Sequence, residues 1–368
     1  MQIERIELHH ISMRLKSPFI TSFGEELDRD CLLVRVHSDG IEGWGECVAS
    51  REPGFSYETV ETAWHILRDY FIPAILNRPI SHPRELKQYL QAYKGHPLAR
   101  AGLEMALWDL LGKLEGKCLR ALLGGEKHRV PVGVSVGIQD KPQVMIEKVG
   151  DYLQSGYGRI KIKIKPGADL EVVRSVRDIY PDIDLQVDAN AAYGLSDAQL
   201  FEDLDPLGLS MIEQPLAEDD LIDHAELQAQ INTPLCLDES IRNQRHAAQA
   251  LAIKACRVIN IKSGRVGGLT EAIAIHDHCV GEGVPVWCGG MLETGIGRAA
   301  NLALASLPGF TLPGDISASD RYYDPDIAKP RFTLNADSTM DVPDKPGLGV
   351  DLNHKELERV TLKVDVLT

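Results

Sequence analysis

The stretch from Gly158 to Gly167 reads GRIKIKIKPG and alternates isoleucine with lysine. Alternation with a period of two residues predicts a β-strand whose isoleucines share one face and whose lysines share the other. On its own, the stretch predicts a half-buried strand with a solvated lysine face, because lysine is rarely buried. Whether the lysines lie in water or inside the protein depends on the fold around them.

From residue 130 onward, short runs rich in β-branched residues recur about every 25 residues. Amphipathic segments such as DLEVVRSVRDIY (169–180) separate them, which predicts strand–helix units and a parallel sheet. An open, doubly wound sheet would share this rhythm, but eight evenly spaced units favour a closed barrel with the isoleucines outward and the lysines inward. The predicted strands span 130–138, 159–164, 183–189, 209–214, 234–240, 257–262, 284–289 and 309–315.

The two ends of the chain lack this rhythm. CLLVRVHSDGIEGWGECVA (31–49) holds two strand-like runs around an Asp-Gly pair, a strong hairpin signal. PLARAGLEMALWDLLGKLEGK (97–117) predicts a helix with one apolar face, and RVTLKVDVLT (359–368) alternates like a strand. The expected units are an α+β domain over 1–125, a barrel over 126–320 and a tail over 321–368 that returns to the first domain.

Composition narrows the class of partner. The chain has 54 acidic and 39 basic residues and a net charge of −15, which argues against nucleic acid or an anionic membrane. No run approaches the roughly 18 apolar residues of a membrane span, and the charged N-terminus is unlike a signal peptide. The seven cysteines never show CxxC spacing, so we expect reduced thiols in a cytoplasmic protein that acts on a small molecule.

Ionisable residues recur where five consecutive predicted strands end. They are spaced by 24 or 25 residues, which places them at one height in a barrel, at the mouth where active sites are built. Three adjacent carboxylates would repel one another unless a cation lies between them, and oxygen-only ligands favour Mg²⁺. Three unrelated surface acids are the alternative, which the constant spacing disfavours. The residues are Lys163, Asp188, Glu213, Asp238 and Lys262.

Lys163 and Lys262 lie on strands on either side of the three acidic strands and would face each other across the metal. A lysine acts as a base near neutral pH only if its pKa falls. The nearby Lys161 ammonium group, a bound metal and burial would each lower the pKa of Lys163. This arrangement suits removal of a proton α to a carboxylate, with the metal stabilising the enediolate. Lys165 is expected to be a solvated rim residue.

These motifs resemble the enolase superfamily, in its muconate-lactonizing-like branch, over essentially the whole chain. The matching segments are KIK (161–163), DAN (188–190), EQP (213–215), DES (238–240) and IKSGRVGG (261–268). Residues 288–319 are similar to the o-succinylbenzoate synthase / N-succinylamino acid racemase family. The resemblance implies an α/β fold with a modified (β/α)₇β TIM-type barrel and an α+β capping domain, and a homo-oligomer.

The same resemblance implies the chemistry. Asp188, Glu213 and Asp238 would bind Mg²⁺ or Mn²⁺, Lys163 would be the acid/base and Lys262 the lysine on the opposite face. A synthase would dehydrate 2-succinyl-6-hydroxy-2,4-cyclohexadiene-1-carboxylate to 2-succinylbenzoate for menaquinone synthesis. A racemase would use both lysines on an N-succinylamino acid. No organic cofactor is implied. The implied supporting residues are Lys161, Asn190, Glu239 and Arg265, the last matching an arginine of racemase-competent members.

We expect substrate-binding residues in the cap and at the mouth of the barrel. The segments SPFITSFG (17–24) and SREPGFSY (50–57) would form an apolar lid that excludes water, although their aromatic residues could instead belong to the core of the cap. The predicted substrate-binding residues are Phe19, Phe23, Tyr57, Ser135, Gly290, Met291, Glu293 and Asp315.

Three other classes of function fit less well. GIGRAA (295–300) resembles a dinucleotide fingerprint, but it lies in the seventh unit after a long loop; the N-terminus of its helix could still hold a substrate carboxylate. Sugar-acid dehydratases of this superfamily resemble those of its members that have a histidine at the seventh strand. This chain has Trp287 and Cys288 at that strand, so it fits this class less well. A barrel retained only for binding would be expected to lose site charges, and all five are present.

Overall fold

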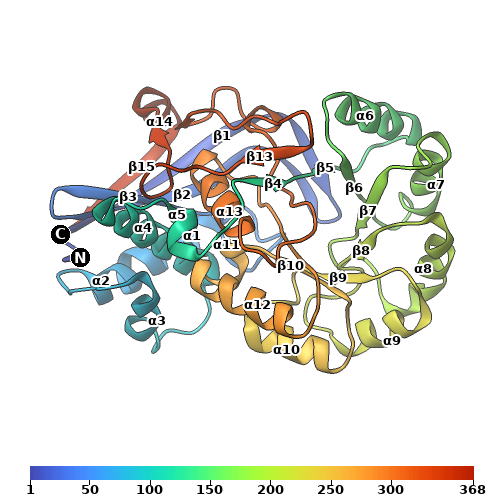
Figure 1. The fold of residues 1–368 in the computed structure, drawn as a ribbon, viewed down its shortest axis with the longest axis horizontal. Helices are drawn as coiled ribbons and strands as arrows, with labels where there is room; N and C mark the ends of the chain where they lie inside the picture. The colour runs from blue at the N-terminus through green and yellow to red at the C-terminus, as the bar shows by residue number, and fades with distance from the viewer.

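The computed structural model describes residues 1–368 and contains a curved, seven-stranded parallel sheet in the order β11-β10-β9-β8-β7-β6-β5, with helices along its outside (Figure 1). This is the predicted TIM-type α/β fold. Its strands are β5 (Val134–Val136), β6 (Arg159–Lys163), β7 (Asp184–Asp188), β8 (Met211–Glu213), β9 (Leu235–Leu237), β10 (Val258–Ile261) and β11 (Val286–Cys288). Its helices are α6 (Pro142–Gln154), α7 (Leu170–Ile179), α8 (Ala198–Leu204), α9 (Ile222–Gln230), α10 (Gln244–Ala252), α11 (Ser263–Val266), α12 (Leu269–Gly281) and α13 (Gly295–Ala305).

The faces of β6 are those of a barrel strand. Ile160, Ile162 and Ile164 are fully buried in the main hydrophobic core. Lys161 and Lys163 are also buried, at 2% and 7% exposure, so the solvated lysine face that the isolated stretch predicts does not form. The surrounding strands thus turn an apparently amphipathic strand into one that is buried on both faces.

Two of the predicted strands differ from the structure, both where the sheet closes. Residues 309–315 form no strand; Phe310 and Gly314 make single bridges, to Val286 of β11 and to Val132 just before β5. The run 130–138 is split, because β4 (Arg129–Pro131) leaves the barrel and pairs with β13 (Thr339–Asp341). Isolated bridges therefore close the ring where a regular eighth strand was expected.

The capping domain is built on an antiparallel sheet in the order β15-β1-β2-β3. Asp39 and Gly40 take positive φ angles of 53° and 75° at the predicted hairpin, which suits the right-handed twist of the strands. Its elements are β1 (Arg5–Thr21), β2 (Gly24–Ser38), β3 (Ile41–Cys47), α1 (Val60–Ile66), α2 (Ile72–Ile75), α3 (Leu86–Tyr89), α4 (Pro97–Glu115) and α5 (Leu119–Leu123). The tail contributes β12 (Ala328–Lys329), β13, β14 (Asp351–Leu352), α14 (His354–Val360) and β15 (Thr361–Leu367).

Helix α4 packs unusually close to the sheet. A Cβ atom at Gly43 or Gly45 of β3 would lie 2.1 Å from the carbonyl oxygen of Ala106 or Gly102, so only glycine fits there. The helix is buried on almost every side, and not along the one apolar face expected, because it also packs against α11 of the barrel. It therefore fixes the cap on the barrel.

Two further expectations concern the whole chain. All seven cysteines are unpaired and buried, as expected for small apolar residues. None of the helices has the length and apolar character that crossing a membrane requires.

Candidate active site

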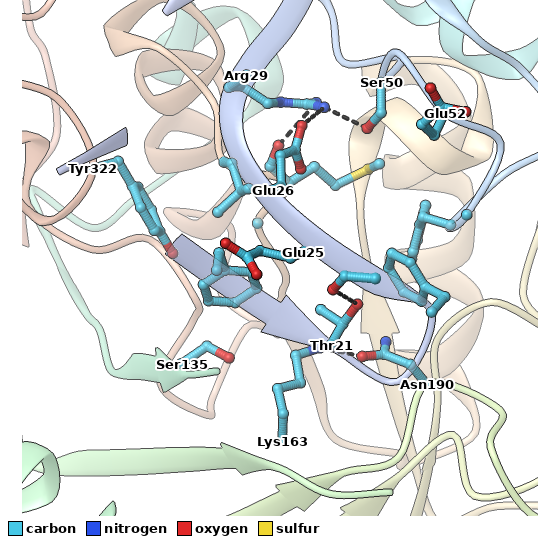
Figure 2. Close-up of a pocket in the computed structure, with 18 of the residues that line it drawn as sticks. Thr21, Glu25, Glu26, Arg29, Ser50, Glu52, Ser135, Lys163, Asn190 and Tyr322 are labelled. Carbon is cyan, nitrogen blue, oxygen red and sulfur yellow. Dashed lines mark hydrogen bonds and ion pairs between the residues drawn. The ribbon is translucent and has the colours of Figure 1, made fainter. Parts of the chain in front are cut away.

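A cavity of about 440 Å³ lies between the mouth of the barrel and the cap. Its lower part is lined by Lys161, Lys163 and Lys262, and we call these lysines and the carboxylates that they contact, Asp188, Glu213 and Asp238, the barrel floor. Its upper part is the cap roof, formed by the tip of the β1–β2 hairpin (residues 19–29) and the loop 50–57. Figure 2 shows Lys163 and Ser135 below the hairpin that carries Thr21, Glu25 and Arg29.

Strand register brings the floor residues together. Lys163 is paired with Asp188 across β6 and β7, and Asp188 is paired with Glu213 across β7 and β8. Asp238 and Lys262 directly follow β9 and β10. The constant spacing in the sequence therefore corresponds to one level in the barrel, and each of these residues is at most 7% exposed.

Lys163 lies between two oxygen acceptors. Its Nζ donates to Asp188 Oδ2 at 2.6 Å and to Asn190 Oδ1 at 2.6 Å, and Asn190 Nδ2 donates to Glu239 Oε1 at 2.9 Å. Burial lowers the pKa of Lys163; the Asp188 carboxylate opposes this, and the Lys161 and Lys262 ammonium groups lower it further. A lowered pKa is what a lysine needs to act as a base near neutral pH.

Lys161 has the opposite electrostatics. Its Nζ lies 2.5 Å from Glu213 Oε2, 2.6 Å from Asp315 Oδ2 and 3.0 Å from Asp188 Oδ2. Burial lowers its pKa, but these carboxylates together raise it well above the usual value. Asp315 also accepts from Arg159 at 2.5 Å. Lys161 therefore stays charged beside Lys163, and the two lysines of KIK are chemically distinct.

Lys262 lies on the other side of the floor. Its Nζ donates to Asp238 Oδ2 at 2.7 Å and lies 4.5 Å from the centre of the Phe55 ring. Arg265 donates to the second oxygen of Asp238 and to two backbone carbonyl groups. Burial lowers the pKa of Arg265 to about 9. Asp238 thus links the predicted opposite-face lysine to the predicted supporting arginine.

The three predicted metal ligands supply only oxygen atoms, the donor type that Mg²⁺ and Mn²⁺ prefer. In the structure, lysine, arginine and asparagine groups donate hydrogen bonds to their oxygens. Burial and the neighbouring Asp188 raise the pKa of Glu213. Burial also acts to raise the pKa of Asp188, but the Lys161 and Lys163 ammonium groups outweigh it and lower this pKa. The donor set fits a hard divalent cation, which would compete with the lysines for the same oxygens.

Most of the predicted substrate-binding residues line the cavity. They are Phe19, Phe23, Ser135, Gly290, Met291 and Asp315. The hydroxyl of Ser135 is buried without a hydrogen-bond partner. This free hydroxyl is available to a ligand.

Two of the predicted substrate-binding residues lie elsewhere. Tyr57 is 58% exposed and lines a neighbouring cavity of about 390 Å³ together with Glu239 and Arg265. Glu293 turns toward α13, where its Oε1 accepts from Asn301 Nδ2 at 2.9 Å. The hydrogen bond with Asn301 therefore turns Glu293 away from the cavity.

The N-terminus of α13 is also unavailable to a substrate carboxylate. Glu46 of the cap accepts from Thr294 N and Gly297 N at 3.1 and 2.9 Å, and from Thr294 Oγ1 at 2.6 Å. Asp326 accepts from Gly295 N at 3.0 Å. These two carboxylates satisfy the free N–H groups that a substrate carboxylate or a dinucleotide phosphate would need.

Sequence reasoning missed several residues of the cavity. Phe55 lines it within the segment 50–57, for which the sequence analysis predicts Tyr57 as the substrate-binding residue. Arg29 reaches across to the carbonyl group of Met291 at 3.2 Å, and Tyr322 of the tail packs edge-on against Phe19. Arg29 lies between two aspartates in β2, and nothing local in the sequence predicts its burial or the position of Tyr322.

Known proteins match the chain along its full length. Residues 5–124 match the family described as "Mandelate racemase / muconate lactonizing enzyme, N-terminal domain", and 144–356 match "Enolase C-terminal domain-like". An o-succinylbenzoate synthase of Geobacillus stearothermophilus is 49% identical over 98% of this chain and 96% of the relative. An N-succinylamino acid racemase of Amycolatopsis sp. is 49% identical over 98% of both. A solved enolase-superfamily member from Listeria innocua superimposes with a TM-score of 0.96 at 39% identity, covering 100% and 99% of the chains.

The fold, the charged barrel floor and the matches along both domains define a member of the enolase superfamily. Within it, the chain belongs to the family of o-succinylbenzoate synthases and N-succinylamino acid racemases.

Proposed function

We propose that this protein is an o-succinylbenzoate synthase that dehydrates 2-succinyl-6-hydroxy-2,4-cyclohexadiene-1-carboxylate to 2-succinylbenzoate, a step of menaquinone biosynthesis. The proposal rests chiefly on one observation. Two buried lysines, Lys163 and Lys262, line a single cavity and donate to Asp188 and Asp238, two of the three carboxylates of the barrel floor. The o-succinylbenzoate synthase from Geobacillus stearothermophilus, which is 49% identical to this chain, supports this choice of substrate.

Lys163 is the proposed acid/base. Its Nζ would take the proton from the carbon that bears the substrate carboxylate and return it to the departing hydroxyl group, so that one water leaves and the ring becomes aromatic. Because one residue serves both steps, the elimination is syn. Lys262 would stabilise the developing negative charge from the opposite face, and Lys161, kept charged by Asp315 and Glu213, would hold down the pKa of Lys163.

Asp188, Glu213 and Asp238 are the proposed ligands of Mg²⁺ or Mn²⁺. A bound ion would supply Lewis-acid stabilisation of the charge that develops on the substrate carboxylate. Asn190, which bonds Lys163 and Glu239, would orient the base. Ser135 offers an unpartnered hydroxyl to the substrate, and Phe19 and Phe55 an apolar surface to its ring. The protein would act on this small carboxylate in the cytoplasm as a homo-oligomer.

Racemisation of N-succinylamino acids is the second candidate function. It is favoured by the racemase from Amycolatopsis, which is as similar as the synthase from Geobacillus, and by the placement of Lys163 and Lys262 in one cavity. In this reaction one lysine removes the α-proton and the other delivers a proton to the opposite face. Synthase chemistry needs proton transfer by Lys163 alone, whereas racemisation needs it from both lysines.

The proposal is tested by turnover of both substrates with the purified protein. We expect dehydration with Mg²⁺ and with Mn²⁺, loss of activity after chelation, and recovery when the ion is restored. Ultraviolet absorbance follows the aromatic product, and optical rotation follows racemisation. Absence of turnover of the cyclohexadiene carboxylate with either ion, under conditions where a known synthase is active, would refute the synthase proposal.

Lys262→Arg separates the two functions, because arginine keeps the positive charge but does not exchange its proton near neutral pH. We expect the variant to retain measurable dehydration and to lose racemisation. In D₂O it should still exchange the α-proton of one enantiomer of the amino acid, the one whose proton faces Lys163, without inverting it. Equal loss of dehydration and exchange would show that Lys262 has the same role in both reactions.

A further inference from the structure

The two edges of the capping sheet differ sharply. Strand β3 forms one edge, and every residue from Gly43 to Cys47 is buried under α4 and the barrel. Strand β15 forms the other edge, pairs only with β1 and is largely exposed (Figure 1). Open edges present unpaired N–H and C=O groups and are usually covered or protected. Strand β15 is the exception within this sheet.

The exposed side chains of β15 are mostly apolar. Leu362, Val364 and Val366 are 60%, 48% and 51% exposed, and alternation separates them by the charged residues Lys363 and Asp365. The Val366 N–H donates to the Asp365 side chain of its own strand at 3.0 Å. Alternation of the ladder then directs the backbone groups of Val364 and Val366 toward the free edge.

We propose that two copies of this protein associate through β15, antiparallel about a twofold axis at Val364, so that the two capping sheets become one continuous sheet. In this register Val364 faces its own counterpart, and Leu362 faces the partner's Val366. Lys363 faces the partner's Asp365, and Asp365 faces the partner's Lys363. The segment Leu362–Val366 is thus complementary to itself in both charge and apolar character.

Charge complementarity selects a second copy as the occupant. A lone lysine on an edge strand commonly prevents pairing, because it meets no counter-charge on a partner strand. Here Asp365, two residues from Lys363, supplies the counter-charge. The twofold axis gives two such Lys363–Asp365 pairs, and opposite charges directly across a ladder are stabilising. Lys363 Nζ lies 4.0 Å from the ring centre of Trp64 on α1, which directs it to the helix-covered side of the sheet. Because side chains alternate along a strand, Leu362, Val364 and Val366 lie on the opposite face of the sheet.

The mass of the wild-type particle gives the first test. Sedimentation of the purified chain, at concentrations from about 1 to 100 µM, should show a particle of at least twice the 40.6 kDa of one chain. Val364→Lys would place two ammonium groups face to face at the twofold axis and should halve that mass. Ile222→Lys, at a 75% exposed position on α9, is the matched control and should leave the mass unchanged. A wild-type monomer throughout this range, or a Val364→Lys particle of unchanged mass, overturns the proposal.

A charge-reversal cycle makes the test specific to the register. Lys363→Asp or Asp365→Lys alone creates like-charged pairs across the axis and should also halve the mass. The double variant exchanges the two charges and should restore the wild-type mass. Turnover and circular dichroism of each variant show that the fold is intact. Singles that still associate, or a double variant that stays dissociated while folded, overturn the pairing.

Discussion

The barrel floor and the cap roof face each other across one cavity but are built by opposite means. The residues of the floor are at most 7% exposed and are ion-paired to one another, whereas Phe23 at the tip of the roof hairpin is 46% exposed. Parallel strands fix the floor through register, while a hairpin tip and a loop carry the roof. The proposed chemistry thus lies on regular strands, and the proposed substrate contacts of the roof lie on a hairpin tip and a loop, where backbones are more variable.

Lys163→Ala should have the largest effect, because it removes the proposed acid/base from the floor. We expect turnover of either substrate to fall by about 10²–10⁴-fold or more. Steady-state kinetics with saturating Mg²⁺ would measure it. Lys165→Ala, two residues along the same stretch and outside the cavity, is the control and should be active. Retention of more than a few per cent of turnover by Lys163→Ala would remove this residue from its assigned role.

Asp315→Asn tests whether the charges of the floor depend on one another. The substitution takes a carboxylate from two buried cations, Arg159 and Lys161, so the free energy of unfolding should drop by about 3–5 kcal/mol. Urea denaturation measures it, with the exposed and nearby Asp320→Asn as the control. A loss below about 1 kcal/mol would mean that the remaining carboxylates suffice for Lys161.

Glu58→Gln tests the anchor of the roof loop. Glu58 accepts from Leu98 N and Ala99 N at the start of α4, and burial raises its pKa to about 7 from 4.5. The acid is protonated in both states below pH 4.5, so wild-type stability should fall as the pH rises from 4.5 to 7, by about 3 kcal/mol. The variant should flatten this fall in urea titrations, whereas Glu61→Gln on α1 should not. An unchanged slope would place the pKa of Glu58 near its ordinary value.

Phe55→Ala should have the smallest effect. It removes a ring that lies 4.5 Å from Lys262 Nζ and lines the cavity, a contact worth about 0.5–2 kcal/mol. We expect KM to rise by up to about 30-fold and kcat to change little. Tyr57→Ala, in the neighbouring cavity, should leave KM within about twofold. Equal effects of the two changes would contradict the placement of Phe55 and Tyr57 on different cavities.

Sequence could predict the floor because its determinants are local and repeated. A period of two in the strand and a period of about 25 between charged residues are sufficient to place Asp188 beside Glu213, as the register confirms. The family and the fold class follow from the same residues. The ion pairing of Lys161 with Asp315 was not predictable, because those residues are 154 positions apart in the sequence and meet only in the closed ring.

The roof and the ring closure were less predictable for a physical reason. Aromatic residues in the loop 50–57 carry no periodicity, so Phe55 and Tyr57 could not be told apart before their neighbours were known. Residues 309–315 show strand-like composition but form only single bridges. Tertiary contacts, and not local propensity, determine both outcomes.

The carboxylate of Glu46 has a mechanical consequence. It joins β3 of the cap to Thr294 and Gly297 at the start of α13 through three hydrogen bonds of 2.6 to 3.1 Å, and Gly43 and Gly45 allow α4 to pack directly on β3. The two domains therefore cannot swing apart without exposing buried polar groups. This leaves the hairpin tip and the loop 50–57 as the parts of the cap roof that lie outside this contact.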